Sequence, residues 1–226
     1  MHQCQIKSLM RVVKRVMKNN LLPVLSAGFK YIASALLAFI IFSIFDADFL
    51  AFISFIVMVA FVFVYRNPER ELPSFEKNSL VSPVDGKIIS IDNIQDTDYA
   101  YKIEIDTTLL DVGVLRTPLD ATLKSVDIKR GARLAKNSHL YKDINEKVEL
   151  VFADENSNSV KVRHQLKRSF NDINIDAVDT QNLKQASRYG LMINGITTIY
   201  LPKNFRLNVS VGSEIKGSQT LIGYFS

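Results

Sequence analysis

Two apolar runs near the N-terminus, residues 31–45 and 49–65, constrain what this chain can fold into more than any other feature. Neither run contains a charged residue, and the acidic turn Asp46-Ala47-Asp48 separates them. At about 1.5 Å per residue, a helix over either run is somewhat shorter than the roughly 30 Å hydrocarbon core of a bilayer, so flanking residues would have to extend it. We therefore expect a hairpin of two membrane helices, with a re-entrant hairpin in one leaflet as the alternative.

Basic residues are concentrated before the hairpin. Residues 1–45 contain six Lys or Arg residues and no Asp or Glu. Within residues 5–25, apolar residues recur at helical spacing, which is typical of an amphipathic helix in the membrane interface; an ordinary surface helix is the alternative. Because Arg66 and Arg70 follow the hairpin, the positive-inside rule places both ends, and the domain after them, on the cytoplasmic side of the inner (cytoplasmic) membrane.

The rest of the chain is predicted to be a mainly β domain. Short runs rich in β-branched and aromatic residues alternate with clusters of Asp, Asn, Ser and Gly, as strands alternate with turns. The expected strands cover residues 87–91, 101–105, 112–115, 123–128, 148–152, 160–164, 173–175, 197–201 and 207–211. Short helical turns are expected near residues 138–145 and 180–187, and the glycine-spaced residues 211–223 resemble hairpins of a half-barrel. We thus expect a membrane part at residues 1–65 and a compact β domain at residues 66–226.

Charge and cysteine content exclude several classes of site. Most of the net charge of +5 comes from residues 1–65, so the β domain is close to neutral. This argues against a nucleic-acid-binding face, whereas the basic N-terminus favours the membrane and anionic phospholipid as partners. The lone Cys4 allows no intrachain disulfide, and the scattered His2, His139 and His164 give no metal-ligand spacing, so we expect no metal site.

The run Ser-Pro-Val-Asp-Gly-Lys at residues 82–87 contains the most informative polar residue, Asp85. Taken alone it predicts a turn, because Pro fixes φ, Gly accepts a positive φ, and Asp bonds nearby amides. Two other runs frame it: Tyr-Arg-Asn-Pro-Glu-Arg at residues 65–70, and Asp-Val-Gly-Val-Leu-Arg-Thr-Pro at residues 111–118. The three runs in this order are far more specific than any one of them.

Together they resemble the phosphatidylserine decarboxylase family in its short, membrane-bound form. In that family Phe-Arg-Asn-Pro-x-Arg leaves the membrane, Ser-Pro-Ala-Asp-Gly follows, and Asp-Val-His-x-x-Arg-x-Pro comes next. The resemblance covers most of the chain and implies a β domain of the same type, with a half-barrel-like C-terminal region. It also implies conversion of phosphatidylserine to phosphatidylethanolamine by a self-generated pyruvoyl group, with no external cofactor.

The resemblance also identifies a processing trio of Asp, His and Ser. In the family, the Ser hydroxyl of a Gly-Ser step attacks the preceding carbonyl, and elimination then cuts the chain and leaves the pyruvoyl group. The Asp corresponds to Asp85, but Gly113 stands at the His position. The Ser position falls on Ile196 or on Gly195, depending on the end from which the shortened stretch is aligned. Neither residue has a hydroxyl, so we expect a diverged member that does not process itself.

Substitutes for the missing groups are available in the sequence, but none has the family's setting. Thr197 is the nearest hydroxyl, and it follows a β-branched residue that would crowd an acyl shift. Ser213 and Ser218 each follow a Gly, in a segment whose sequence predicts turns. Either His139 or His164 could replace the lost base by approaching in space, although a lone His among charged residues is more often solvated.

Four basic residues are candidates for binding a lipid headgroup: Arg116, Arg163, Lys167 and Arg168. Arg116 is retained from the family motif. The other three lie in a basic segment that replaces a mostly apolar one, which in the family usually helps to hold the substrate. Such side chains suit phosphate or carboxylate groups, and a solvated strand and turn is the alternative.

Three functions remain open. The first is a non-catalytic homologue that binds phospholipid or regulates an active enzyme of phosphatidylethanolamine synthesis. The second is an active phosphatidylserine decarboxylase with an atypical processing site, so whether the chain is an enzyme stays undecided. The third is a membrane-anchored β adaptor that binds a protein partner. The sequence leaves a homo-oligomer open in each case.

Overall fold

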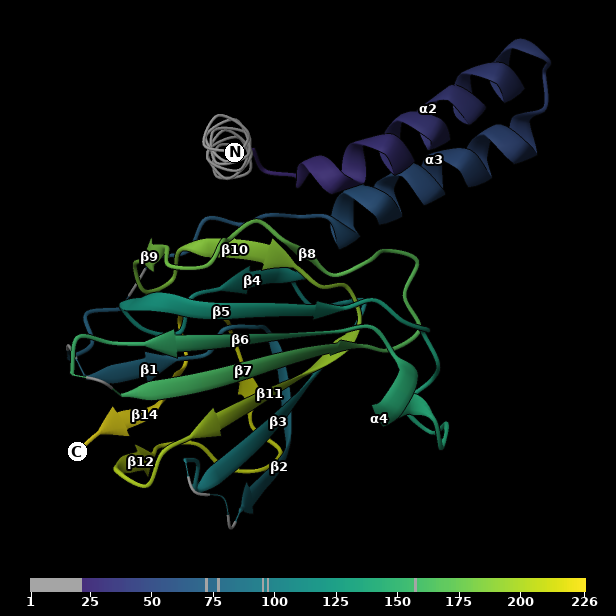
Figure 1. Ribbon diagram of the computed structural model, residues 1–226. Helices are drawn as coiled ribbons and strands as arrows, with labels where there is room; N and C mark the ends of the chain where they lie inside the picture. The colour runs from purple at the N-terminus through teal and green to yellow at the C-terminus, as the bar shows by residue number, and fades with distance from the viewer. Residues whose placement is uncertain (1–21, 72, 77, 95, 97, 157) are drawn as a thin grey trace, which may run out of the picture. The chain divides into compact units, whose positions relative to one another are not determined.

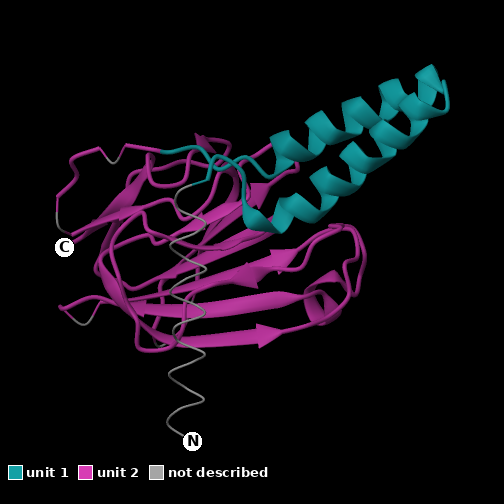
Figure 2. Ribbon diagram, turned by 90° about the horizontal axis from the view of Figure 1, so that it is seen from above, with its two compact units in different colours: residues 1–69 teal, residues 70–226 magenta. Residues whose placement is uncertain are grey.

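The computed structural model describes residues 22–226 except positions 72, 77, 95, 97 and 157. The chain divides into two compact units, residues 1–69 and residues 70–226 (Figures 1 and 2). The interfacial helix predicted for residues 5–25 lies almost entirely outside the described residues. Each unit is described below by itself.

The first unit is a hairpin of two apolar helices. A short 3-10 turn, η1 (Ser26–Gly28), leads into α2 (Phe29–Ile44), and α3 (Asp48–Val64) follows after a tight turn. The prediction of two helices over the apolar runs is therefore confirmed. The segment Ser26–Ile44 is long and apolar enough to cross a membrane by length and composition, while α3 is apolar but shorter.

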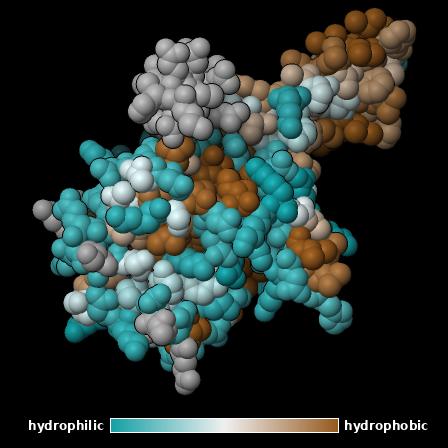
Figure 3. All heavy atoms as spheres, viewed as in Figure 1, coloured by the Kyte–Doolittle hydropathy of each residue, from teal (hydrophilic) through white to brown (hydrophobic). Residues whose placement is uncertain are grey.

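Small residues let the two helices approach closely. Ala35 of α2 and Ala51 and Ser54 of α3 are the buried residues of the pair, as in helix interfaces within membranes. Large apolar side chains cover the rest of the hairpin surface, which is mostly hydrophobic in Figure 3. In water such a surface would be strongly unfavourable, so the hairpin is suited to a lipid environment.

The second unit is a β domain with three sheets. The largest has the order β13-β2-β3-β11-β7-β6-β5-β9, and the smaller ones are β1-β14-β12 and β4-β10-β8. The element bounds are β1 (Ser79–Val81), β2 (Gly86–Asn93), β3 (Tyr101–Thr107), β4 (Val114–Arg116), β5 (Ala121–Lys129), α4 (Tyr141–Ile144), β6 (Lys147–Ala153), β7 (Ser159–Leu166), β8 (Asn174–Ile175), β9 (Asn182–Leu183), β10 (Arg188–Leu191), β11 (Gly195–Leu201), β12 (Phe205–Leu207), β13 (Glu214–Ile215) and β14 (Leu221–Phe225). The expectation of a mainly β fold is confirmed.

The central strands of the large sheet alternate between core and outer face. On β6, for example, Val148, Leu150 and Phe152 are buried, and the residues between them are partly exposed. This alternation places every second side chain of β3, β11 and β7 in one hydrophobic core, which also receives side chains from both small sheets. Two expected elements differ: of residues 207–211 only Leu207 lies in a strand, as the last residue of β12, and residues 180–187 contain β9 in place of a helical turn.

Candidate functional site

The structure brings the three positions of the processing trio to one end of the large sheet. Gly195 begins β11 and pairs with Thr107, the last residue of β3. The Thr107 hydroxyl donates to the backbone carbonyl of Asp85 over 2.7 Å. From the other side, the Met192 amide donates to the carbonyl of Gly113 over 2.9 Å. Asp85 and Gly195, which are far apart in sequence, thus meet around Thr107, and Gly113 joins them through Met192.

The Asp85 carboxylate is fully engaged by groups other than a histidine. Arg70 donates to both of its oxygens, over 2.5 and 2.6 Å, and the Gly217 amide donates to Oδ1 over 2.8 Å. The pair is nearly buried, with 9% of the Arg70 side chain and 12% of the Asp85 side chain exposed. Charge-assisted bonds of this kind are strong and directional. The carboxylate therefore joins the start of the β domain to its C-terminal hairpins.

The backbone next to Asp85 has a conformation that requires glycine. Gly86 has φ of +150°, and a Cβ at this position would run into the carbonyl oxygen of Asp106. Beside it, the Ser82 hydroxyl donates to the Val84 carbonyl over 2.7 Å and closes the turn. The run that resembles the family motif is thus a tight turn whose geometry depends on its Gly, Ser and Asp.

Met192 lies beside both glycines, next to Gly195 through its side chain and next to Gly113 through its backbone. A Cβ on Gly195 would overlap the Met192 sulfur and lie only 2.8 Å from the Gln165 carbonyl oxygen. A Cβ on Gly113 would lie 2.9 Å from the Met192 carbonyl oxygen and 3.0 Å from a methyl group of Leu191. Met192 itself is completely buried. Any side chain at these two glycines would force the surrounding core to move.

Ile196, the other candidate for the Ser position, faces away from this core. It pairs with Asp106 and Gln165 on the outer face of the sheet and is nonetheless buried. The short helix α4 lies at the same place, because the Gln165 side-chain amide donates to the Tyr141 carbonyl over 2.9 Å. The Ile196 side chain is thus an ordinary apolar packing group of the outer face.

Three buried polar side chains of the same core, His164, Thr197 and Tyr189, lie in contact with one another. His164 Nδ1 is 2.8 Å from the Thr197 hydroxyl, and its Nε2 is 2.7 Å from the Tyr189 hydroxyl. All three residues are buried, and burial lowers the pKa of His164 from 6.5 to about 3 and raises the pKa of Tyr189 well above its ordinary value. The expectation that His164 is solvated is therefore wrong, whereas His139 is exposed.

This His–Thr–Tyr cluster is a neutral hydrogen-bonding group. Thr197 pairs with Ile105 on one side and His164 on the other, within a regular ladder of three strands. A nucleophile that attacks its own preceding carbonyl needs a backbone free to bend toward the tetrahedral state, and strained φ/ψ is typical of such sites. Thr197 is held in a regular extended conformation between two strands. The cluster is therefore better suited to a structural role, as a buried network whose hydrogen bonds are satisfied.

The four candidate headgroup-binding residues lie at different places. Arg116 is buried on β4, where it donates to the Ala186 carbonyl over 3.4 Å. Arg163 on β7 binds Glu149 over 2.8 Å, and Lys167 binds Asp106. Arg168 is exposed. Two of the four cations are therefore already paired with carboxylates of the same domain.

Sequence reasoning missed Met192, Arg70 and Tyr189 as parts of the site. The β7 pattern does contain a signal for His164, since Val160, Val162 and His164 are two residues apart and must share a face of the strand. No comparable signal marks Met192, whose position depends on a loop between two sheets. Among the described residues, no cluster of three or more His, Cys, Asp and Glu side chains is placed to hold a metal ion.

Comparison with known proteins agrees with the motifs. A family model described as phosphatidylserine decarboxylase matches residues 57–223. Among similar proteins, the phosphatidylserine decarboxylase proenzyme of Geotalea daltonii is 28% identical over 214 residues, which cover 92% of this chain and 99% of that protein. The proenzyme of Desulfotalea psychrophila is 25% identical over 206 residues, covering 89% and 96%. That of Wolbachia pipientis is 27% identical over 170 residues, covering 71% and 73%.

Proposed function

The chain belongs to the phosphatidylserine decarboxylase family, and from that premise we propose that it is a non-processing member of the family. In this proposal it stays uncut and does not decarboxylate. It retains the family's β domain and an apolar anchor, and it acts in phospholipid metabolism by binding lipid or by regulating an active enzyme.

The packing of Met192 carries the proposal. It occupies the space beside Gly195 and contacts Gly113 through its backbone. A serine at position 195 would displace this side chain, and a histidine at position 113 would press on the Met192 carbonyl and on Leu191.

The residues present do not fit a pyruvoyl precursor. Formation of that group needs a hydroxyl on the residue after the attacked carbonyl, and neither Gly195 nor Ile196 supplies one. Glycine and isoleucine side chains have no oxygen that could accept the acyl group, so the shift to an ester is chemically excluded. We therefore derive no decarboxylation step for this chain.

A second candidate is an active decarboxylase that cuts itself before Thr197. The 2.8 Å contact between His164 Nδ1 and the Thr197 hydroxyl favours it, because a base within hydrogen-bond reach is the first requirement of an activated nucleophile. The buried, regular strand around Thr197 disfavours it. A third candidate is a β adaptor that binds a protein partner through the same scaffold.

Intact mass spectrometry of the full chain, purified in detergent, tests the proposal. We expect one species near 25.5 kDa and no release of CO₂ from phosphatidylserine. The proenzyme from Geotalea daltonii, prepared in the same way, is the positive control. A C-terminal fragment that begins between residues 195 and 198 with a blocked N-terminus would contradict the proposal, and its loss in Thr197→Val would establish the second candidate.

We also propose that the β domain faces the cytoplasm. The basic residues before the hairpin and Arg66 after it support this orientation. A green fluorescent protein fused after Ser226 should fluoresce in cells, as it does only on the cytoplasmic side. A dark fusion at normal protein level, together with protease access from the periplasm, would reverse the orientation.

A further inference from the structure

Exposed large apolar side chains of the β domain gather at one end of the large sheet. This end lies where β5 and β7 finish and β6 begins, beside α4 (Figure 1). We call residues 108–112, 128–147 and 167–173 the α4 end. Among the described residues of the β domain, the exposed large apolar side chains there are Leu109, Leu110, Ile128, Leu140, Ile144 and Phe170. The remaining exposed one, Val211, lies elsewhere, beside β2.

The helix α4 presents two of these side chains on a fixed support. Tyr141 is buried, and the Gln165 side chain donates to the carbonyls of Tyr141 and Lys142 over 2.9 and 3.2 Å. Leu140 and Ile144 are four residues apart and therefore lie on one side of this turn. They are 54% and 44% exposed, and hydrophobic atoms are visible at the surface beside α4 in Figure 3.

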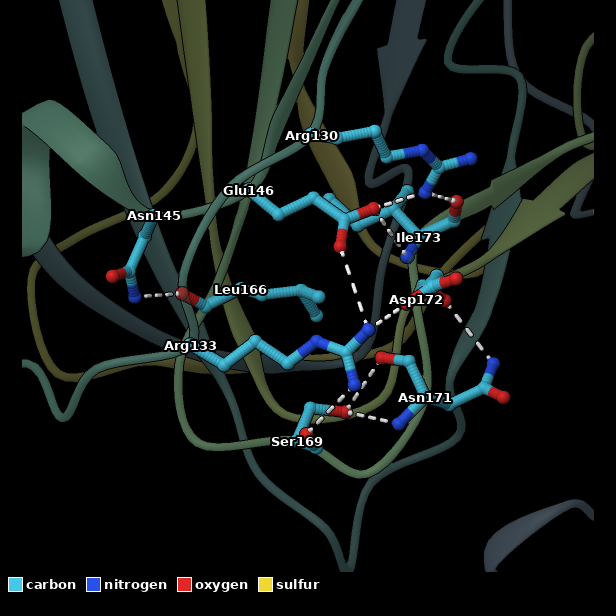
Figure 4. A network of polar contacts seen from close by, with 9 residues as sticks. All are labelled: Arg130, Arg133, Asn145, Glu146, Leu166, Ser169, Asn171, Asp172 and Ile173. Atoms are coloured by element: carbon cyan, nitrogen blue, oxygen red, sulfur yellow. Dashed lines mark hydrogen bonds and ion pairs between the residues drawn. The ribbon is translucent and has the colours of Figure 1, made fainter.

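A polar network holds the neighbouring loop, which carries Phe170. Glu146 is almost completely buried and accepts from Arg130 and from the Ile173 amide (Figure 4). Arg133 binds both Asp172 and the Ser169 carbonyl. These bonds tie residues 130–146 to residues 167–173 on both sides of Phe170.

The fixed geometry of both loops matters for the argument. A mobile loop could bury its apolar side chains against its own domain, but these loops are held open by specific hydrogen bonds and ion pairs. Exposed apolar groups on a rigid support are typical of an interaction surface. The α4 end is therefore preorganised to meet a partner.

The charge of the α4 end identifies the kind of partner. It contains eight Lys or Arg residues against four Asp or Glu, and the rest of residues 70–226 contains thirteen against sixteen. Three of the eight cations pair with acids just outside these ranges: Lys136 and Lys167 with Asp106, and Lys129 with Asp127. Lys142 and Arg168 are exposed within two residues of the apolar Leu140, Ile144 and Phe170. Apolar side chains surrounded by cations match the layered chemistry of an anionic bilayer, with acyl chains below and phosphates above.

We propose that the α4 end docks on an anionic lipid bilayer, with Leu140, Ile144 and Phe170 entering the interface and the cations at the phosphates. An apolar hairpin directly precedes the β domain in the sequence. Once the hairpin is in a membrane, the domain remains close to a bilayer and weak docking suffices. The proposal holds whether or not the chain is processed, so it stands or falls separately from the proposed function.

Fluorescence of an environment-sensitive label tests the docking on the full chain. Cys4 is replaced by Ser, and a nitrobenzoxadiazole label is attached at His139→Cys, next to Leu140. The labelled protein is reconstituted in phosphatidylcholine nanodiscs with or without phosphatidylglycerol. We expect a blue shift and quenching by spin-labelled lipid when phosphatidylglycerol is present, and loss of both at high salt. A label at Asn156→Cys, in the exposed turn at the opposite end of β6, should show neither.

Matched variants separate the apolar contribution from general changes. Leu140→Ser combined with Ile144→Ser should abolish the shift at position 139, whereas Val211→Ser, which removes an equally exposed side chain elsewhere, should leave it unchanged. The proposal is overturned if the label at position 139 behaves like that at position 156 in both lipids. It is equally overturned if the label is already shielded in detergent without lipid, since another protein copy would then cover this surface.

Discussion

At the scale of single residues, two buried polar side chains of the β domain, His164 and Asp85, are accommodated in different ways. His164 lies between two hydroxyls and stays neutral, because charging it would cost desolvation that no carboxylate offsets. Asp85 is charged and buried, and Arg70 balances it. One group avoids charge and the other is paired, which are the two ways a protein core accommodates ionisable side chains.

His164 makes stability depend on pH. Burial lowers its pKa to about 3 in the folded state, against 6.5 in the unfolded chain. Between these values the unfolded state binds more protons, so the free energy of unfolding falls as the pH falls, by about 1.4 kcal/mol per pH unit. His164→Asn should reduce this slope in thermal unfolding of the full chain in detergent, while the exposed His139→Asn should keep it. An unchanged slope in His164→Asn would assign the acid sensitivity to other groups.

Removing one partner of the Arg70–Asp85 pair should lower the free energy of unfolding by more than the attraction between the two side chains suggests. Arg70→Met leaves a buried carboxylate without its cation, and we expect a loss of about 3–5 kcal/mol in denaturant unfolding. The double variant with Asp85→Asn added to Arg70→Met should recover part of this lost stability. Lys102→Met is the control, since its ion pair with Glu104 is more exposed and should contribute less than about 1 kcal/mol. Equal losses in Arg70→Met and Lys102→Met would contradict a buried role.

At the scale of elements, the strands that were predictable are those with alternating burial. In β6 and β7 buried residues alternate with more exposed ones, because one face of each strand packs in the core and the other is partly exposed to solvent. β10 was missed, since its four residues are short and mostly buried without alternation. β1 was missed for a different reason: it is three residues long and exists through pairing with β14, far away in the sequence. A local sequence pattern carries no information about pairing with a strand that is distant in the sequence.

The sequence predicts that Gly113 and Gly195 or Ile196 stand at the family His and Ser positions. The packing of the Met192 side chain beside Gly195 could not be predicted, because it is set by the loop between β10 and β11. The same holds for the contact of His164 with Thr197, which depends on the register of β7 against β11.

The start of β11 should therefore resist restoration of a serine. Gly195→Ser places a Cβ on the Met192 sulfur, and we expect a loss of about 1–3 kcal/mol from overpacking. Met192→Ala alone should cost about 2–5 kcal/mol through the cavity it leaves. The double variant should be more stable than the sum of these losses by about 0.5–3 kcal/mol, because each change relieves the other. Strict additivity in chemical denaturation would show that the two residues do not compete for space.

At the scale of the whole molecule, the two units have separate sources of stability. The hydrophobic core of the β domain runs from Leu80 to Phe225 and includes no residue of the helical hairpin. The hairpin has its own contacts, such as the stacked rings of Tyr31 and Phe61 at 5.3 Å. A shared core is thus not needed for either unit, and the chain joins an apolar helical hairpin to a β domain with a core of its own.

The β domain should consequently fold when the anchor is removed, provided that the cut preserves Arg70. A fragment of residues 70–226 has the complete core and the Arg70–Asp85 pair, so it should unfold cooperatively in a thermal melt. A fragment of residues 71–226 lacks only that arginine, and it should melt at a temperature lower by roughly 10 °C, because a few kcal/mol correspond to such a shift in a domain of this size. Equal melting temperatures would mean that Asp85 finds another partner, and aggregation of both fragments would show that the hairpin is part of the folding unit.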